Sequence, residues 1–277
     1  MKRSHIKQHL MSAMIGATCA VTFLGGANAA DLYQNASGLK DSPDAVAAPL
    51  TGFYLGAKIG GSVLDLSDRS VKYGAFDYTE DSVRYTAGDQ KWDTGSGTDA
   101  VIGGGVMVGY NLNGVVGLPV RAEFDYVARG KGSVDQAHDV IYDLYSDGEH
   151  TPRNARLGQN DKIGVQTTLM SLYLDIPIGA AITPYVGGGV GAAFIDHETT
   201  VYDDDGVNYS RSHESTNFAW AVGGGLAWAI DGHKTIDISY RYVDAGDSSV
   251  KKGNWEPISA NTSIATHDVM LGFRYGF

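Results

Sequence analysis

Apolar side chains alternate with polar or small ones along eight segments of this chain. In the third segment, Leu118, Phe124 and Tyr126 lie on one face, and Arg121 and Asp125 lie on the other. Because successive side chains of a strand point to opposite faces, this period of two predicts β-strands with one apolar face each. The eight predicted strands lie within residues 53–60, 102–111, 118–126, 166–176, 185–195, 217–230, 236–242 and 268–277.

The second face of these strands is unusual for a soluble sheet, because it combines charges with many glycines. Glycine triplets occur at residues 103–105, 187–189 and 223–225. Small residues suit the crowded interior of a narrow barrel, whereas a soluble sandwich would place bulky polar residues in water. We therefore predict a closed barrel, with a secreted sandwich as the alternative. The charges predicted to pair across its lumen are Lys58, Arg121, Glu123, Asp125, Asp175, Asp237, Arg241 and Arg274.

The connections between the strands alternate in length. Those near 113–117, 177–182 and 231–234 are short, and those near 65–99, 131–161, 197–215 and 245–264 are long and polar. Since the longest apolar run after the first thirty residues spans only 218–230, strands rather than helices would have to cross a membrane. The pattern predicts an all-β fold, an eight-stranded antiparallel transmembrane up-and-down barrel over 51–277, with four long extracellular loops and short periplasmic turns.

The first fifty residues differ from the rest. Lys2, Arg3 and Lys7 precede an apolar stretch and the small residues Ala27–Ala30, which predicts a signal peptide over 1–30, cleaved after Ala29 or Ala30. Residues 31–50 lack alternation and are expected to form a periplasmic lead-in. The mature chain would carry 18 − 32 = −14 charges after the loss of three basic residues, which argues against a nucleic-acid partner.

Two sets of side chains are candidate binding residues. Cations near the predicted outer strand ends could contact the phosphates of lipopolysaccharide, or could merely keep the strand ends soluble. They are Arg129, Lys131, Lys162, Lys251 and Lys252. The predicted loop at 197–215 contains His197, Asp203, Asp205 and His213, a weak candidate set for a divalent ion, for which solvated loop residues are the simpler interpretation. We expect no cofactor.

The last strand ends on Phe273, Tyr275 and Phe277, alternating aromatics that resemble the insertion signal of outer-membrane barrels. With the segments 39–43 and 51–56, it resembles the small porin-family and OmpA-like barrels of alphaproteobacteria. The resemblance implies an outer-membrane location, recognition by the barrel assembly machinery, and contact with lipid and lipopolysaccharide. The chain ends at this strand, so the peptidoglycan-binding domain of full-length OmpA is not expected.

Members of that family include surface antigens, adhesins, haem-binding proteins and narrow pores, so the resemblance leaves the ligand open. We predict a structural, surface-interaction barrel that presents variable loops, possible sites for a host or haem ligand, and catalyses nothing. A narrow porin for small solutes and a haem- or metal-binding or adhesin barrel are the alternatives. A lipid-modifying enzyme is the least favoured, because no serine pairs convincingly with His267, the histidine best placed at the rim.

Overall fold

A computed structural model describes residues 52–178, 182–204, 208–251 and 258–277. The predicted signal peptide, the lead-in, Asp205 and Lys252 lie outside these residues. Within the described ranges, no helix combines the length and the apolar content that crossing a membrane would require.

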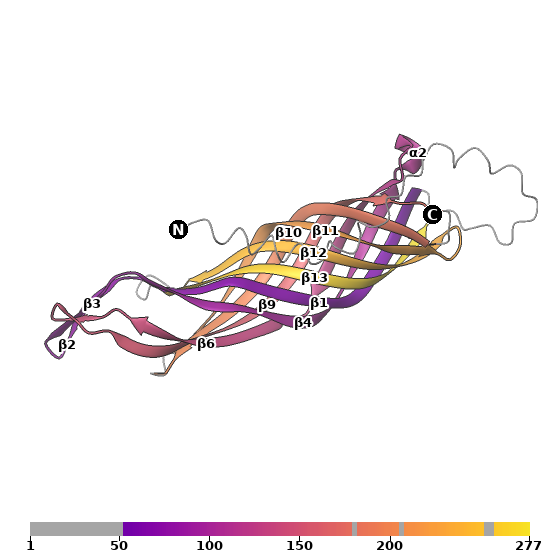
Figure 1. Cartoon of the computed structure of the whole chain (residues 1–277). Helices are drawn as coiled ribbons and strands as arrows, with labels where there is room; N and C mark the ends of the chain where they lie inside the picture. The colour runs from indigo at the N-terminus through magenta and orange to yellow at the C-terminus, as the bar shows by residue number, and fades with distance from the viewer. Residues whose placement is uncertain (1–51, 179–181, 205–207, 252–257) are drawn as a thin grey trace, which may run out of the picture. The chain divides into compact units, whose positions relative to one another are not determined.

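Eight antiparallel strands form a closed ring, which confirms the predicted fold class (Figure 1). Each strand pairs with the next one in the ring, β13 pairs with β1, and β9 pairs with both β5 and β10. The ring strands are β1 (Gly52–Tyr73), β4 (Gln90–Asn111), β5 (Val120–Arg129), β9 (Arg153–Asp175), β10 (Ile182–Asp203), β11 (Asn208–Ala229), β12 (Lys234–Lys251) and β13 (Ile258–Gly276). A ninth strand, β6 (Gly132–Tyr142), continues the line of β5 along β9 after a one-residue bulge.

The short connections lie together at one end of the barrel, which we call the turn end. One contains a helical turn, α2 (Asn113–Val116), closed by Gly117 in the left-handed region with φ of 70°. In another, the Asp231 carboxylate accepts hydrogen bonds from the backbone N–H groups of His233 and Lys234. The last strand ends here, since Gly276 N donates to His233 O, and the first strand starts beside it, since Phe277 N donates to Phe53 O. The opposite end is the loop end.

The outer face of the strands near the turn end is an apolar band. Side chains such as Phe53, Ile102, Met170, Phe218 and Leu271 expose between 55% and 77% of their surface, whereas their strand neighbours point inward. So large an exposed apolar surface is what a barrel in lipid presents. The inward and outward faces of all eight strands agree with the predicted alternation.

The glycines on the inner face leave room for aromatic side chains in the lumen. A Cβ at Gly109 would overlap the ring of Tyr54, and a Cβ at Gly225 would approach both Ile238 O and the ring of Tyr185. These positions are therefore glycine because a bulky tyrosine on the neighbouring strand occupies the space that a side chain would need.

Toward the loop end the strands are much longer than predicted. Segments 65–99, 131–161, 197–215 and 245–264, predicted as loops, consist mostly of strand that continues the ladders of the barrel, for example from Asp196↔Glu214 to Tyr202↔Asn208. The prediction of four long polar loops is corrected accordingly. β1 runs ten residues beyond Val63, its last apolar outward residue, which is about 33 Å along the strand.

Beyond the apolar band, the ring divides into two four-stranded sheets, β6–β9–β10–β11 and β12–β13–β1–β4. The β11–β12 ladder ends at Trp220↔Asp244, and beyond it Asn217 Nδ2 donates to the backbone oxygens of Ala245 (3.0 Å) and Asp247 (2.8 Å). On the opposite side, Gln136 Nε2 donates to Ser96 O at 2.7 Å. Side-chain amides thus join the sheets at two seams where the backbone ladder stops.

An apolar core fills the space between these two sheets. It consists of two clusters of buried side chains, the first around Leu64, Ile163 and Ile195, the second around Val71 and Leu157. Each of these five side chains exposes 2% or less of its surface. The loop end is therefore a packed two-sheet structure rather than an open barrel mouth.

Two of the connections at the loop end fold together into a separate small sheet. It has the order β2 (Phe76–Glu80), β3 (Val83–Ala87), β7 (Tyr145–Ser146) and β8 (Glu149–His150), so it combines the β1–β4 connection with the β6–β9 connection. β2 and β3 lie at the end of the barrel opposite α2 (Figure 1). We call this sheet the tip.

Candidate functional site

The eight charges predicted for the lumen all lie on the inner face of the barrel. Arg121, Glu123 and Asp125 on β5 are at most 4% exposed, and the Lys58 and Asp175 side chains are 10% and 15% exposed. Asp237, Arg241 and Arg274 complete the set. Buried charges are tolerated only with partners, so the contacts among them decide what the lumen can do.

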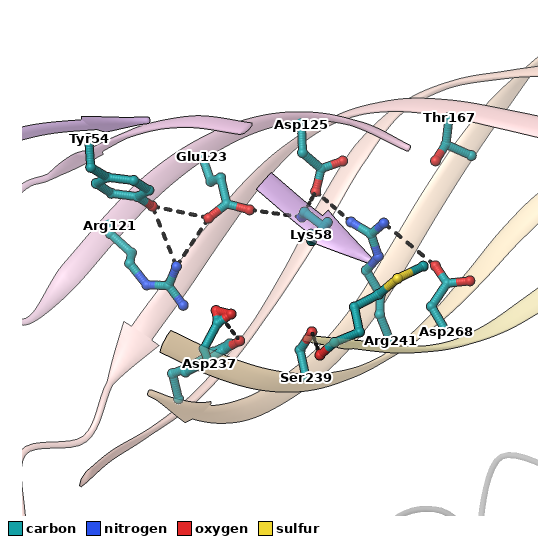
Figure 2. A network of polar contacts seen from close by, with 12 residues as sticks. Tyr54, Lys58, Arg121, Glu123, Asp125, Thr167, Asp237, Ser239, Arg241 and Asp268 are labelled. Carbon is teal, nitrogen blue, oxygen red and sulfur yellow. Dashed lines mark hydrogen bonds and ion pairs between the residues drawn. The ribbon is translucent and has the colours of Figure 1, made fainter. Parts of the chain in front are cut away.

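Lys58 is at the centre of the network, between two carboxylates of β5 (Figure 2). Its Nζ lies 2.8 Å from Asp125 Oδ2 and 3.3 Å from Glu123 Oε1. Asp125 also accepts from Arg241 Nη1 at 2.6 Å. Because Arg241 comes from β12, these contacts cross the lumen and tie opposite walls together.

Nearer the turn end, the Arg121 side chain lies buried in the lumen. Its guanidinium lies 3.0 Å from Asp175 and 3.2 Å from Glu123. The same group lies against the rings of Tyr173 and Tyr185, at 4.4 and 4.3 Å from their centroids, and these two rings meet edge to face. A planar cation held by two carboxylates and two rings is fixed in place.

Toward the loop end, Asp268 extends the network, and this corrects one prediction. Arg129 was expected on the outer rim, but its side chain is fully buried and donates to both Asp268 oxygens, at 2.9 and 2.6 Å. Arg129 lies on the inward phase of β5 with Arg121 and Asp125, and Asp268 is a carboxylate that sequence reasoning did not assign to the network. Ser62 Oγ donates to Asp268 at 2.8 Å.

The two additions, one cation and one carboxylate, keep the lumen charges in balance. Five cations, Lys58, Arg121, Arg129, Arg241 and Arg274, accompany five carboxylates, Glu123, Asp125, Asp175, Asp237 and Asp268. A neutral, cross-linked set of this kind favours neither cations nor anions as permeating solutes.

The other predicted rim cations that the structure describes lie on the outside of the barrel. Lys131 pairs with Asp196 at 2.5 Å, and both side chains are about half exposed. Lys162 and Lys251 are exposed. Of the predicted cations that the structure describes, Lys162 and Lys251 are therefore the two that remain exposed without an ion pair to a described residue, so the candidate lipopolysaccharide-binding set is smaller than the sequence predicted.

A second buried network, missed by the sequence analysis, lies inside the loop end. Arg69 Nε donates to Asp161 Oδ2 at 2.8 Å, and both side chains are fully buried. Arg69 Nη2 also donates to the backbone oxygens of Val134 and Gln159, at 3.1 and 2.7 Å. His197 lies 3.0 Å from Asp161 Oδ1 and 2.9 Å from Ser248 Oγ.

The position of His197 contradicts the prediction that it shares a loop with the other candidate ligands of a divalent ion. It is fully buried on β10, whereas His213, its cross-strand neighbour on β11, is exposed. Asp203 is half buried at the end of β10. The described members therefore do not share one exposed loop. Among the residues that the structure describes, no group of three or more His, Cys, Asp or Glu side chains could hold a metal ion.

Ser248, His197 and Asp161 are connected in the order of a hydrolase triad, but their burial argues against catalysis. None of the three exposes more than 1% of its surface, and the apolar core surrounds them. A nucleophile must reach its substrate, so this arrangement is better explained as a satisfied polar network in a packed interior.

Comparisons with known proteins agree with this architecture. The model of the OmpA-like transmembrane domain matches residues 50–276. Outer membrane protein PagN of Salmonella typhimurium is 30% identical over 243 residues, covering 84% of this chain and 93% of that protein. An uncharacterized Brucella suis protein is 26% identical, covering 93% and 95%. The crystal structure of the outer membrane protein OprG from Pseudomonas aeruginosa matches 84% of this chain and all of that chain, with 14% identity and a TM-score of 0.39.

Proposed function

Because this chain belongs to the OmpA-like transmembrane domain family and is an outer-membrane β-barrel, we propose that it is a closed surface-interaction protein. In this proposal the barrel anchors the molecule in lipid, and the loop end presents a rigid platform outside the cell. The observation that carries the proposal is the packed loop end, where strands, an apolar core and a small sheet replace open loops.

The lumen supports a structural role rather than conduction. A solute entering from the turn end would meet the Arg121 guanidinium, which is held against two tyrosine rings. Beyond the charged network it would meet the buried apolar side chains Leu64, Ile163 and Leu169, each at most 1% exposed. Moving an ion through a dry apolar layer is strongly unfavourable, so this barrel should not act as a narrow porin.

We propose different partners for the membrane-embedded barrel and for the loop end. The apolar band contacts membrane lipid, and exposed Lys162 and Lys251 contact lipopolysaccharide phosphates. A host ligand would bind at the tip and the adjoining strand ends, which extend beyond the band. No catalytic role is proposed, since the one Ser–His–Asp arrangement among the described side chains is buried.

Two measurements test the proposal. The first is conductance of the refolded protein in planar bilayers, where we expect no stepwise currents; discrete steps would support the porin alternative. The second is attachment of a non-adhesive bacterium that expresses the protein to cultured host cells. Replacing residues 76–87 and 144–151 with short Gly-Ser links should abolish attachment. The variant should keep the heat-modifiable band of a folded barrel, which is a change in electrophoretic mobility between unheated and boiled samples. Undiminished attachment by the tip-less barrel would reject the tip as the interaction surface.

A further inference from the structure

One face of the tip is an exposed aromatic surface. Alternation along the strands and the β2–β3 register, with Tyr78 opposite Tyr85, place Phe76, Tyr78 and Tyr85 on the same face. The rings of Tyr78 and Tyr85 stack at 5.3 Å, and Phe76 lies 5.7 Å from Tyr78. Tyr78 is 49% exposed. These rings pack against one another and leave a platform open to solvent.

Two carboxylates border this platform on the same face. Glu80 lies two residues after Tyr78 on β2 and therefore on the same face. Glu149 shares this face because Tyr85 pairs with Ser146, and Ser146 pairs with Glu149. Both are exposed, and neither forms an ion pair with another described residue. We call Phe76, Tyr78, Glu80, Tyr85 and Glu149 the tip face.

The whole tip is strongly acidic. Residues 76–87 and 144–151 contain five carboxylates, Asp77, Glu80, Asp81, Asp147 and Glu149, and one guanidinium, Arg84, which gives 1 − 5 = −4. Arg84 is on the opposite face and binds both oxygens of Asp77, at 2.9 and 2.5 Å. This hydrogen-bonded guanidinium lowers the pKa of Asp77 below its ordinary value. The tip therefore has no free cation to offer an anionic partner.

The two connections are locked together, so the tip face is formed before any partner arrives. Arg84 N donates to Asp147 Oδ1 at 2.9 Å, and Asp147 N donates to Arg84 O at 2.8 Å. Asp147 and Gly148, with φ of 49° and 84°, form the tight turn between β7 and β8. A preformed surface loses little conformational entropy on binding.

We propose that the tip face binds a lysine- or arginine-rich segment of a polypeptide. Ammonium or guanidinium groups would stack on the Tyr78 and Tyr85 rings, and Glu80 and Glu149 would neutralise their charge. The negative charge of the tip would exclude sulfated or phosphorylated polyanions. The inference rests on the proposed function, since it names the chemistry of the partner that the platform would hold.

The experiment uses the full-length refolded protein in micelles and a fluorescent octalysine peptide, followed by anisotropy at low and high salt. We expect saturable binding that weakens with salt, and no competition for the octalysine site by an octaglutamate peptide or by heparin bound to the protein. In Tyr78→Ala/Tyr85→Ala and in Glu80→Gln/Glu149→Gln, the affinity should fall by about tenfold or more. Retention of the heat-modifiable band shows that each variant is folded.

A matched variant separates a specific site from general attraction to an acidic protein. Glu198→Gln/Glu214→Gln removes two carboxylates from the outer faces of β10 and β11 and leaves the tip unchanged. It should bind octalysine as the wild type does. The proposal would be overturned if both carboxylate double variants lost equal affinity, if heparin bound and its binding required the tip, or if the double tyrosine variant kept wild-type affinity. If attachment to cells still requires the tip, the proposed function stands while this inference fails.

Discussion

The buried Arg69–Asp161 pair should be one of the main stabilising contacts of the loop end. Asp161→Asn keeps the shape of the side chain but removes its charge, which leaves Arg69 in a core where both side chains are fully buried. Removing one partner of a buried ion pair costs about 3–5 kcal/mol. That energy changes the equilibrium between folded and unfolded protein by about two to four powers of ten.

Arg69→Met should cost a similar amount for a partly different reason. It leaves the Asp161 charge without its guanidinium and also leaves the backbone oxygens of Val134 and Gln159 without the Nη2 donor. An unsatisfied buried acceptor costs about 1–3 kcal/mol. The double variant Arg69→Met/Asp161→Asn removes both charges, so it should lose clearly less stability than the sum of the single variants.

The assay is urea unfolding of the refolded protein in micelles, followed by tryptophan fluorescence and by electrophoretic mobility. Glu198→Gln, a carboxylate change on the outer face of β10, is the control and should stay within about 0.5 kcal/mol of the wild type. A loss below about 1 kcal/mol in Asp161→Asn, or strict additivity in the double variant, would refute the view that this pair is buried and coupled.

Three further predictions concern the lumen, the tip and the C-terminal strand. Gly109→Val should prevent formation of the heat-modifiable band, because its side chain would overlap the Tyr54 ring. Ser82→Gly should stabilise the β2–β3 hairpin by about 1 kcal/mol and slow protease cleavage there, because Ser82 has a φ of 69°; unchanged cleavage would contradict this. Phe277→Ala should lower the amount of assembled barrel in cells while leaving the urea midpoint of refolded protein nearly unchanged, since Phe277 is 72% exposed; equal assembly would remove its role in insertion.

The membrane-embedded part of the fold could be predicted because each strand there has one apolar and one polar face. The pattern around Arg121, Glu123 and Asp125 is enough to place β5 and to orient its side chains. It gives no information on which carboxylate each cation contacts. Those pairs depend on the stagger of the strands, which brings Arg241 of β12 to Asp125 of β5 across the lumen.

The tip could not be predicted from periodicity. β7 and β8 contain two residues each, which is too short for any repeat to be recognised. β7 becomes a strand because β3 provides an edge for pairing, through Tyr85↔Ser146 and Thr86↔Tyr145, and β8 pairs in turn with β7. A sheet assembled from two distant connections is a tertiary property, and neither connection alone specifies it.

The length of the strands, by contrast, could have been recognised in the sequence. The apolar residues continue to alternate with polar ones beyond the membrane, but they change from the outward to the inward face of the strand. On β9 the apolar residues of the lipid-facing band are Met170, Leu172 and Leu174, which point outward. Beyond the band they are Leu157, Ile163 and Val165, which point inward.

Along β9 the apolar side chains therefore occupy even-numbered positions where they face lipid and odd-numbered positions where they face the core. The same switch separates Val190 and Phe194 from Ile195 and Val201 on β10. It has a simple physical cause, because the solvent outside the strand changes from hydrocarbon to water while the backbone ladder continues unbroken. A strand that leaves the membrane without ending must therefore exchange its faces. Reading the alternation in a single phase treats that exchange as the start of a loop, which is why Arg69, Asp161 and His197 were placed outside the barrel.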